Sequence, residues 1–134
     1  MSEEHHDLTE SERYDRGMAV RREVLGDTHV DRATANITDF TREFQEFISR
    51  TAWGDVWTRP GLARRERSIA VLSSLIALGH HEEFSMHVRA ALRNGLTRDE
   101  IAEVILQSAI YAGVPAANTA FRLAQAVFAE LDAG

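Results

Sequence analysis

Apolar residues recur at helical spacing along most of the chain, and no segment shows the strict alternation of a β-strand. The clearest case begins at Pro115, a residue suited to the first turn of a helix. Its apolar positions lie three or four residues apart, at Ala117, Ala120, Phe121, Ala124, Val127, Phe128 and Leu131. This periodicity predicts an all-α fold, a compact bundle of about six helices with short antiparallel connections.

Capping signals set the ends of the expected helices. Thr9-x-x-Glu12 and Thr97-x-x-Glu100 have the spacing of capping boxes, and Gly95 follows a helix that begins near His81. We expect helices over residues 9–25, 31–53, 63–78, 81–94, 98–112 and from 115 onward, with loops at 26–31 and 54–61. The continuity of the second helix between Asn36 and Thr38 is left open.

Two apolar surfaces stand out within this scheme. A stripe of side chains in the second helix is interpreted as a core face rather than a cofactor-binding surface; it comprises Phe40, Phe44, Phe47, Ile48 and Thr51. The segment Ile69–Leu78 is apolar nearly all round, so it must be covered on every side. A domain of this size provides little cover, which favours a homo-oligomer with this segment at subunit contacts.

Composition narrows the class of protein. A chain of 134 residues, 44% hydrophobic and 27% charged, predicts one helical domain over residues 9–134 after a disordered tail at 1–8. There is no cysteine, which excludes disulfides and thiol chemistry. No apolar run approaches a membrane span and the N-terminus is unlike a signal peptide, so we expect no membrane partner and a cytoplasmic location. The net charge of −6 argues against nucleic-acid binding.

Three titratable residues form the best candidate for a catalytic site. Glu83 and His87 are four positions apart in the fourth helix, and His80 lies one step further back. Metal binding is one interpretation, but facing helices offer few inward ligands, so we expect no metal. A structural histidine–carboxylate pair is the second. The third, which we favour, is a proton-transfer site in which the carboxylate orients the imidazole.

A second constellation lies between Arg50 and Arg67, where five of the fifteen arginines and both tryptophans occur. The segment can be a solvated loop with two anchoring aromatic residues. As a group, however, these side chains suit a small, planar, anionic substrate, because arginine binds carboxylates in a bidentate manner. The expected substrate-binding residues are Arg50, Arg59, Arg67, Trp53 and Trp57.

Four segments in one unbroken order resemble the carboxymuconolactone decarboxylase family, within the alkylhydroperoxidase-like superfamily. They are FQEFISRTAWGDVWTRPGL at 44–62, RSIAVLSSLIALG at 67–79, HVRAALRNGLTRDEI at 87–101 and YAGVPAANTAF at 111–121. His87 takes the position of the family's motif histidine. The two cysteine positions of the thiol branch are here His80 and Glu83, and its glutamate position is Ser68, so peroxidase chemistry is excluded.

The resemblance implies a fold, a reaction and an assembly. Similar enzymes decarboxylate 4-carboxymuconolactone, a dianionic lactone, to 3-oxoadipate enol-lactone in protocatechuate catabolism, and they do so without a cofactor. They form trimer-based rings, often hexamers. For this chain the resemblance implies catalysis by His87 and Glu83, with His80 beside them. Two alternatives stay open: an enzyme of the same fold acting on a different lactone or acid, and a non-catalytic helical oligomer.

Overall fold

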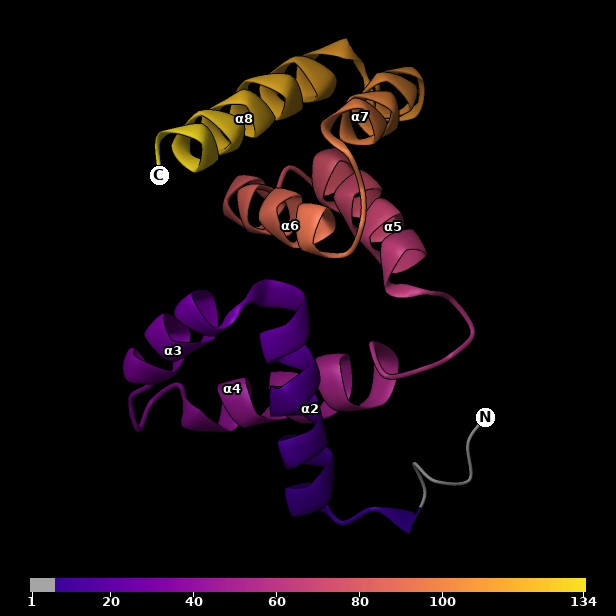
Figure 1. Ribbon diagram of the computed structural model, residues 1–134. Coiled ribbons are helices and arrows are strands. Elements are labelled where there is room, and N and C mark those ends of the chain that lie inside the picture. Colours follow the sequence, from indigo (N-terminus) through magenta and orange to yellow (C-terminus); the bar gives the residue numbers. More distant parts are fainter. Residues whose placement is uncertain (1–6) are drawn as a thin grey trace. The chain divides into compact units, whose positions relative to one another are not determined.

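The computed structural model describes residues 7–134, and these form helices and no strands (Figure 1). The all-α prediction is confirmed; the expected tail at 1–8, with His5 and His6, lies almost entirely outside the described residues. The helices are α2 (Glu10–Leu25), α3 (Asp27–Ala35), α4 (Arg42–Ile48), the π-helix η1 (Ser49–Val56), α5 (Arg64–Leu78), α6 (His81–Arg93), α7 (Arg98–Ala112) and α8 (Val114–Ala133).

The chain divides into two compact units, one ending at Ala63 and the other spanning Arg64–Gly134. The first unit therefore holds α2, α3, α4 and η1, and the second holds α5 to α8. That residues 9–134 act as one domain stays a prediction.

In the first unit, α2 packs closely against η1. Gly17 on α2 and Gly54 on η1 are both buried, and neither backbone leaves room for a side chain toward its neighbour. Beside this contact, the Arg13 guanidinium donates two hydrogen bonds to the Asp55 carboxylate, of 3.1 and 2.5 Å. Two small residues thus permit the close approach, and a bidentate ion pair fixes its register.

In the second unit, a continuous apolar core joins all four helices. Leu72 of α5, Phe84 and Val88 of α6, Ile101 of α7 and Ala124 of α8 belong to this core and are nearly inaccessible to solvent. The small side chains of α8 let that helix approach its neighbours closely. The apolar spacing predicted for α8 is confirmed at Ala117, Ala120, Ala124 and Val127, which are buried, whereas Phe121 and Leu131 are exposed.

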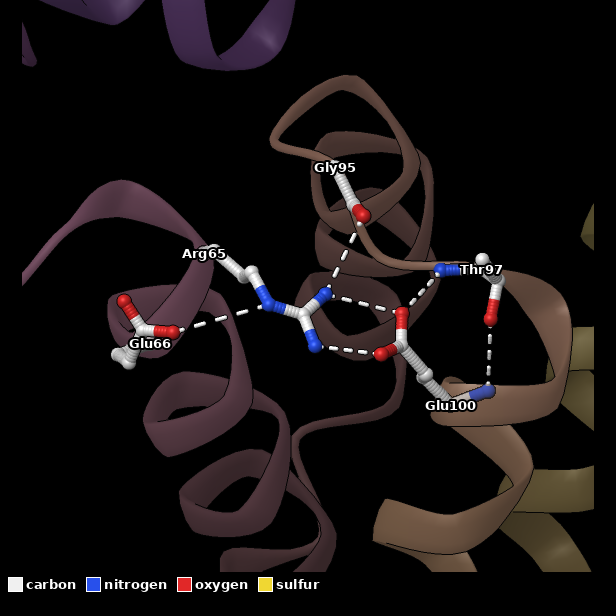
Figure 2. Close-up of polar contacts among 5 residues, drawn as sticks. All are labelled: Arg65, Glu66, Gly95, Thr97 and Glu100. Carbon is white, nitrogen blue, oxygen red and sulfur yellow. Dashed lines mark hydrogen bonds and ion pairs between the residues drawn. The ribbon is translucent and has the colours of Figure 1, made fainter.

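A polar contact joins the start of α5 to the start of α7 (Figure 2). Arg65 pairs with the carboxylate of Glu100, with one hydrogen bond of 2.9 Å, and also donates to the Gly95 carbonyl at 3.2 Å. Glu100 also completes the predicted capping box with Thr97. Because Arg65 donates hydrogen bonds to it, and the Thr97 backbone N–H does so as well, the pKa of Glu100 falls to about 2.

Two local expectations were wrong, and one open point is resolved. The segment expected as a loop at 26–31 contains the start of α3, because the single residue Gly26, at φ 91°, turns the chain and Val30 is then fully buried. The loop expected at 54–61 is helical as far as Val56, because Gly54 packs against α2 instead of forming a turn. The open point near Asn36 is settled as a break, since α3 ends at Ala35 and α4 begins at Arg42.

The phenylalanine stripe is not a core face within the described residues. Phe40 is 97% exposed, Phe44 61% and Phe47 52%. The reason is that η1 supplies the packing surface through Ser49, Trp53 and Gly54, whereas α4 has no buried residue. In α5, Leu72 and Ile76 are buried but Leu78 is exposed, so part of that apolar segment also lacks cover among residues 7–134.

No helix among residues 7–134 combines the length and the apolar character needed to cross a membrane.

Candidate functional site

Helix α6 carries the residues predicted to be catalytic. It begins at His81, as expected, and its buried side chains include Phe84, His87, Val88 and Ala91, which lie three or four positions apart. His87 is only 7% exposed, so an imidazole replaces an apolar side chain on the inner face of the helix. A titratable group in such surroundings is a candidate for proton transfer.

The other two members of the predicted group lie differently. Glu83 is one turn before His87 on α6 and is exposed, in the first helical turn where a carboxylate complements the helix dipole. His80 precedes the helix, with φ −86° and ψ 83°, and is also exposed. Of the three residues predicted to be catalytic, only His87 therefore lies on the inner face of α6.

Two further polar residues, Asn94 at the end of α6 and Ser68 on α5, were not predicted to belong to the site. Asn94 lies seven residues after His87, hence on the same side of the helix, and its side-chain amide donates a 2.9 Å hydrogen bond to Ser68 Oγ. Ser68 on α5 is fully buried. The sequence signal for Ser68 was its position in the helix. It lies between Arg67 and Ile69 and four residues before Leu72, which places it on the inner face.

The residues predicted to bind substrate divide between the two units. Arg50, Trp53, Trp57 and Arg59 belong to the first, whereas Arg67 belongs to the second, together with the histidines of α6. Whether Arg67 acts jointly with the other arginines stays a prediction.

Among the arginines predicted to bind substrate, Arg50 of the first unit lines a cavity. It is half-buried on η1 and borders a space of about 240 Å³ with Glu10, Ser11, Tyr14 and Glu46. A π-helix is uncommon and frequently occurs at functional sites. Arg50 therefore has both the exposure and the setting of a ligand-binding residue.

The two tryptophans differ in exposure. Trp53 is 5% exposed and Trp57 is half-buried, with ring centroids 5.2 Å apart and planes tilted by 31°. Such a pair stabilises its own segment through aromatic contact. Arg59, by contrast, is exposed after the end of η1, and Arg67 is half-buried in the first turns of α5.

Arg21 on α2 borders a further cavity and was not among the predicted site residues. The signal was its position: Val24 and Leu25 follow it at three and four residues, so it lies on the apolar side of its helix. Among residues 7–134, no three His, Asp or Glu side chains are grouped so that they could hold a metal ion.

The comparisons with known proteins bear on this geometry. The carboxymuconolactone decarboxylase family matches residues 42–126, from the start of α4 into α8. A 4-carboxymuconolactone decarboxylase of Acinetobacter baylyi is 49% identical over 124 residues, which are 92% of this chain and 92% of that protein. The nitrosuccinic acid decarboxylase npaB of Metarhizium robertsii is 43% identical over 112 residues, 84% of this chain and 78% of that protein.

The family match spans more than half of the chain and includes η1 and the whole of α6, and the relative from Acinetobacter extends the similarity to nearly the full length. The chain therefore belongs to the carboxymuconolactone decarboxylase family.

Proposed function

We propose that this protein is a carboxy-lyase that converts 4-carboxymuconolactone into 3-oxoadipate enol-lactone and carbon dioxide. The observation that carries the proposal is the 49% identity, over 92% of both chains, to a 4-carboxymuconolactone decarboxylase. The resemblance of the motifs in α6 and in the segment from Phe44 to Leu62 points to the same reaction.

The substrate supplies its own electron sink. When the ring carboxylate leaves as carbon dioxide, the electron pair of the broken C–C bond moves through the conjugated double bond to the lactone carbonyl oxygen. The result is a furanolate-like dienolate. A proton then adds to a ring carbon and restores the carbonyl. The protein has to orient the carboxylates, stabilise the oxyanion and deliver that proton, which requires neither metal nor organic cofactor.

His87 is proposed as the proton donor. It is the titratable side chain on the inner face of α6, and its low exposure suits an acid that must deliver its proton to substrate rather than to water. Glu83, one turn away, is proposed to orient the imidazole or to balance the charge of the imidazolium. His80, which immediately precedes α6, is proposed to assist catalysis from that position. Solvent returns the proton after each turnover.

Arg50, Arg59 and Arg67 are proposed to hold the carboxylates of the substrate, with Trp53 and Trp57 bordering its planar ring. The support is chemical: guanidinium groups bind carboxylates through two parallel hydrogen bonds. Arg50 adds a structural reason, since it borders a cavity on η1.

A second candidate substrate class has specific support. The relative from Metarhizium is named for the decarboxylation of nitrosuccinic acid, another dicarboxylic acid. In general, loss of carbon dioxide beside a nitro group also leaves an electron pair on oxygen atoms and requires protonation at carbon. The alternative of a different acid on the same fold is therefore kept beside the lactone.

We further propose that the protein works as a homo-oligomer, trimer-based and hexameric by resemblance. Exposed apolar residues support this assembly, since Phe40, Leu78 and Ile110 are 97%, 68% and 79% exposed in the isolated chain. Light scattering that returns a monomer of about 15 kDa at micromolar concentration would contradict the oligomer.

The test of function is a direct turnover assay. Freshly generated 4-carboxymuconolactone is supplied to the purified protein with and without a strong chelator, and carbon dioxide release and loss of lactone are followed. Nitrosuccinate is assayed in parallel. Turnover of the lactone that is unaffected by the chelator, with a higher kcat/KM than that of nitrosuccinate, supports the proposal. Turnover of nitrosuccinate alone favours the second class, and no turnover of either favours a non-catalytic oligomer.

A further inference from the structure

The cavity beside Arg21 has the features of a ligand site in the first unit. It encloses about 250 Å³ and is lined by residues of α2, α3 and α4, the segment between α3 and α4, and the start of η1. This volume is just below that of drug-sized pockets, which suits a small molecule. Its lining is largely polar and includes Tyr14, Arg21, Thr34, Arg42, Gln45 and Ser49.

Arg21 has no acidic partner among residues 7–134, although the chain has more acidic than basic side chains. Its one hydrogen bond is a long one of 3.5 Å to Ser49 Oγ, and its Nε atom is buried without an acceptor. Other arginines of the described chain form ion pairs with Asp or Glu, namely Arg13, Arg22, Arg42, Arg65, Arg89 and Arg98.

An incompletely paired guanidinium is costly to bury. Burial lowers the pKa of Arg21, because solvent is removed from the cation, and the nearby Tyr14 hydroxyl offsets this only in part. A bound anion would restore the lost interactions, since a guanidinium offers two parallel N–H groups to a carboxylate. Arg21 lines the cavity, so its guanidinium is available there as an ion-pair partner for such an anion.

The other residues that line the cavity limit the charge of the ligand that it can bind. Arg42 also lines the cavity, but its charge is already paired with Asp39 at 2.5 Å, and Gln45 has a buried Oε1 atom without a hydrogen-bond donor. Glu46 lines this cavity as well. Together with Tyr14 it also lines the neighbouring cavity of Arg50, so its carboxylate lies where the two cavities adjoin. A nearby carboxylate disfavours a ligand with several negative charges.

We propose that the cavity between α2 and α4 binds the carboxylate group of a small organic acid, with Arg21 as its main ion-pair partner. The proposal does not depend on the decarboxylase reaction, because it follows from the incompletely paired guanidinium of Arg21. It adds a binding residue that neither the motif resemblance nor the arginine-rich segment indicates.

The test uses the full-length protein, labelled with ¹⁵N, and sodium butyrate as the probe. Butyramide, which is similar in shape but uncharged, serves as the control ligand, and sodium chloride keeps the ionic strength constant. The Nε–H resonance of Arg21 is assigned from its loss in Arg21→Gln. We expect it to shift saturably with butyrate and not with butyramide.

Affinity is followed at the backbone amide of Ser49, which is present in every variant. Arg21→Gln should weaken butyrate binding by about tenfold or more, because a hydrogen-bonded charge pair is lost. Arg32→Gln, on the exposed side of α3, is the matched control and should leave the affinity unchanged. Arg21→Lys should weaken binding less than Arg21→Gln, since charge remains but the planar pair of donors is lost.

Three results would overturn the proposal: no saturable shift of the Arg21 resonance, an equal response to butyramide, or unaltered affinity in a folded Arg21→Gln variant. Circular dichroism melts establish folding. If the glutamine variant does not fold, the Arg21 resonance is assigned from its loss in Arg21→Lys, and the wild-type titration then decides. Because no turnover is measured, failure here leaves the decarboxylase proposal standing, and failure of the turnover assay leaves this proposal standing.

Discussion

Gly17 is the position at which the packing of the first unit can be tested most sharply. A Cβ atom at Gly17 would lie 1.8 Å from the Ser49 carbonyl oxygen, 2.8 Å from its carbon and 2.9 Å from the Gly54 nitrogen. An ordinary carbon–oxygen contact is about 3.3 Å or longer. Because all three atoms belong to the backbone of η1, no side chain can rotate away, and α2 would have to move by about 1.5 Å.

The expected cost of Gly17→Ala follows from opposing contributions. Alanine is favoured over glycine in a helix by about 1 kcal/mol. Overpacking a tight contact costs about 1–3 kcal/mol or more. Displacement of α2 also loosens the burial of Val20 and Val24, and each such side chain contributes about 1.5–3 kcal/mol when fully buried. We expect a net loss of about 2–4 kcal/mol in the free energy of unfolding.

Urea denaturation followed by tryptophan fluorescence measures this loss. Both tryptophans, Trp53 and Trp57, belong to the first unit, so the signal reports the unit in which the change is made. Gly61→Ala is the matched control, because a Cβ there meets nothing within 4 Å and its backbone is not left-handed. That control should change stability by no more than about 1 kcal/mol, and upward.

Equal stability of Gly17→Ala and wild type, at an unchanged dependence on urea, would refute the close contact between α2 and η1. A loss in Gly61→Ala as large as in Gly17→Ala would also refute it, because the effect would then not depend on the space at Gly17.

Three further changes test other parts of the account. Because the pKa of Glu100 is lowered to about 2, its ion pair with Arg65 stabilises the folded state fully above the ordinary value of 4.5, and this stabilisation is lost as the pH falls toward 2. The urea midpoint of Glu100→Gln should therefore fall less steeply over that pH range than the midpoint of wild type. His87→Asn should lower kcat by about 10²–10⁴-fold while the protein remains folded. His81 is exposed on the same helix, so His81→Asn should retain activity. Similar rates in the two variants would contradict a donor role for His87. Arg50→Lys should lower kcat/KM in steady-state assays although the charge is kept, and wild-type kinetics would place the carboxylate contact elsewhere.

Much of the fold could be predicted because local signals agree with tertiary packing. Thr9 and Thr97 both form the predicted capping boxes, and four of the seven apolar positions predicted in α8 are buried. The start of α3 was missed because a single glycine, Gly26, both ends one helix and begins the next. Periodicity alone does not distinguish such a turn from a loop.

Periodicity also failed where an apolar stripe has no partner within the described chain. Phe40 and Phe44 follow a core pattern but are exposed, because the π-turns of η1 present a different face to α2. At the candidate site, His87 was identified from its helical position, whereas burial of Ser68 and Arg21 depends on which helices pack together. That information is tertiary, so spacing along the chain does not contain it.

The central claim is that His87 protonates the dienolate left after carbon dioxide departs. Turnover of 4-carboxymuconolactone in deuterium oxide, with the configuration of the new C–D bond determined by NMR, tests it most directly. The account predicts stereospecific labelling by wild type and by His81→Asn, and slow, racemic labelling by His87→Asn. Unchanged stereospecificity at a near-normal rate in His87→Asn would contradict it.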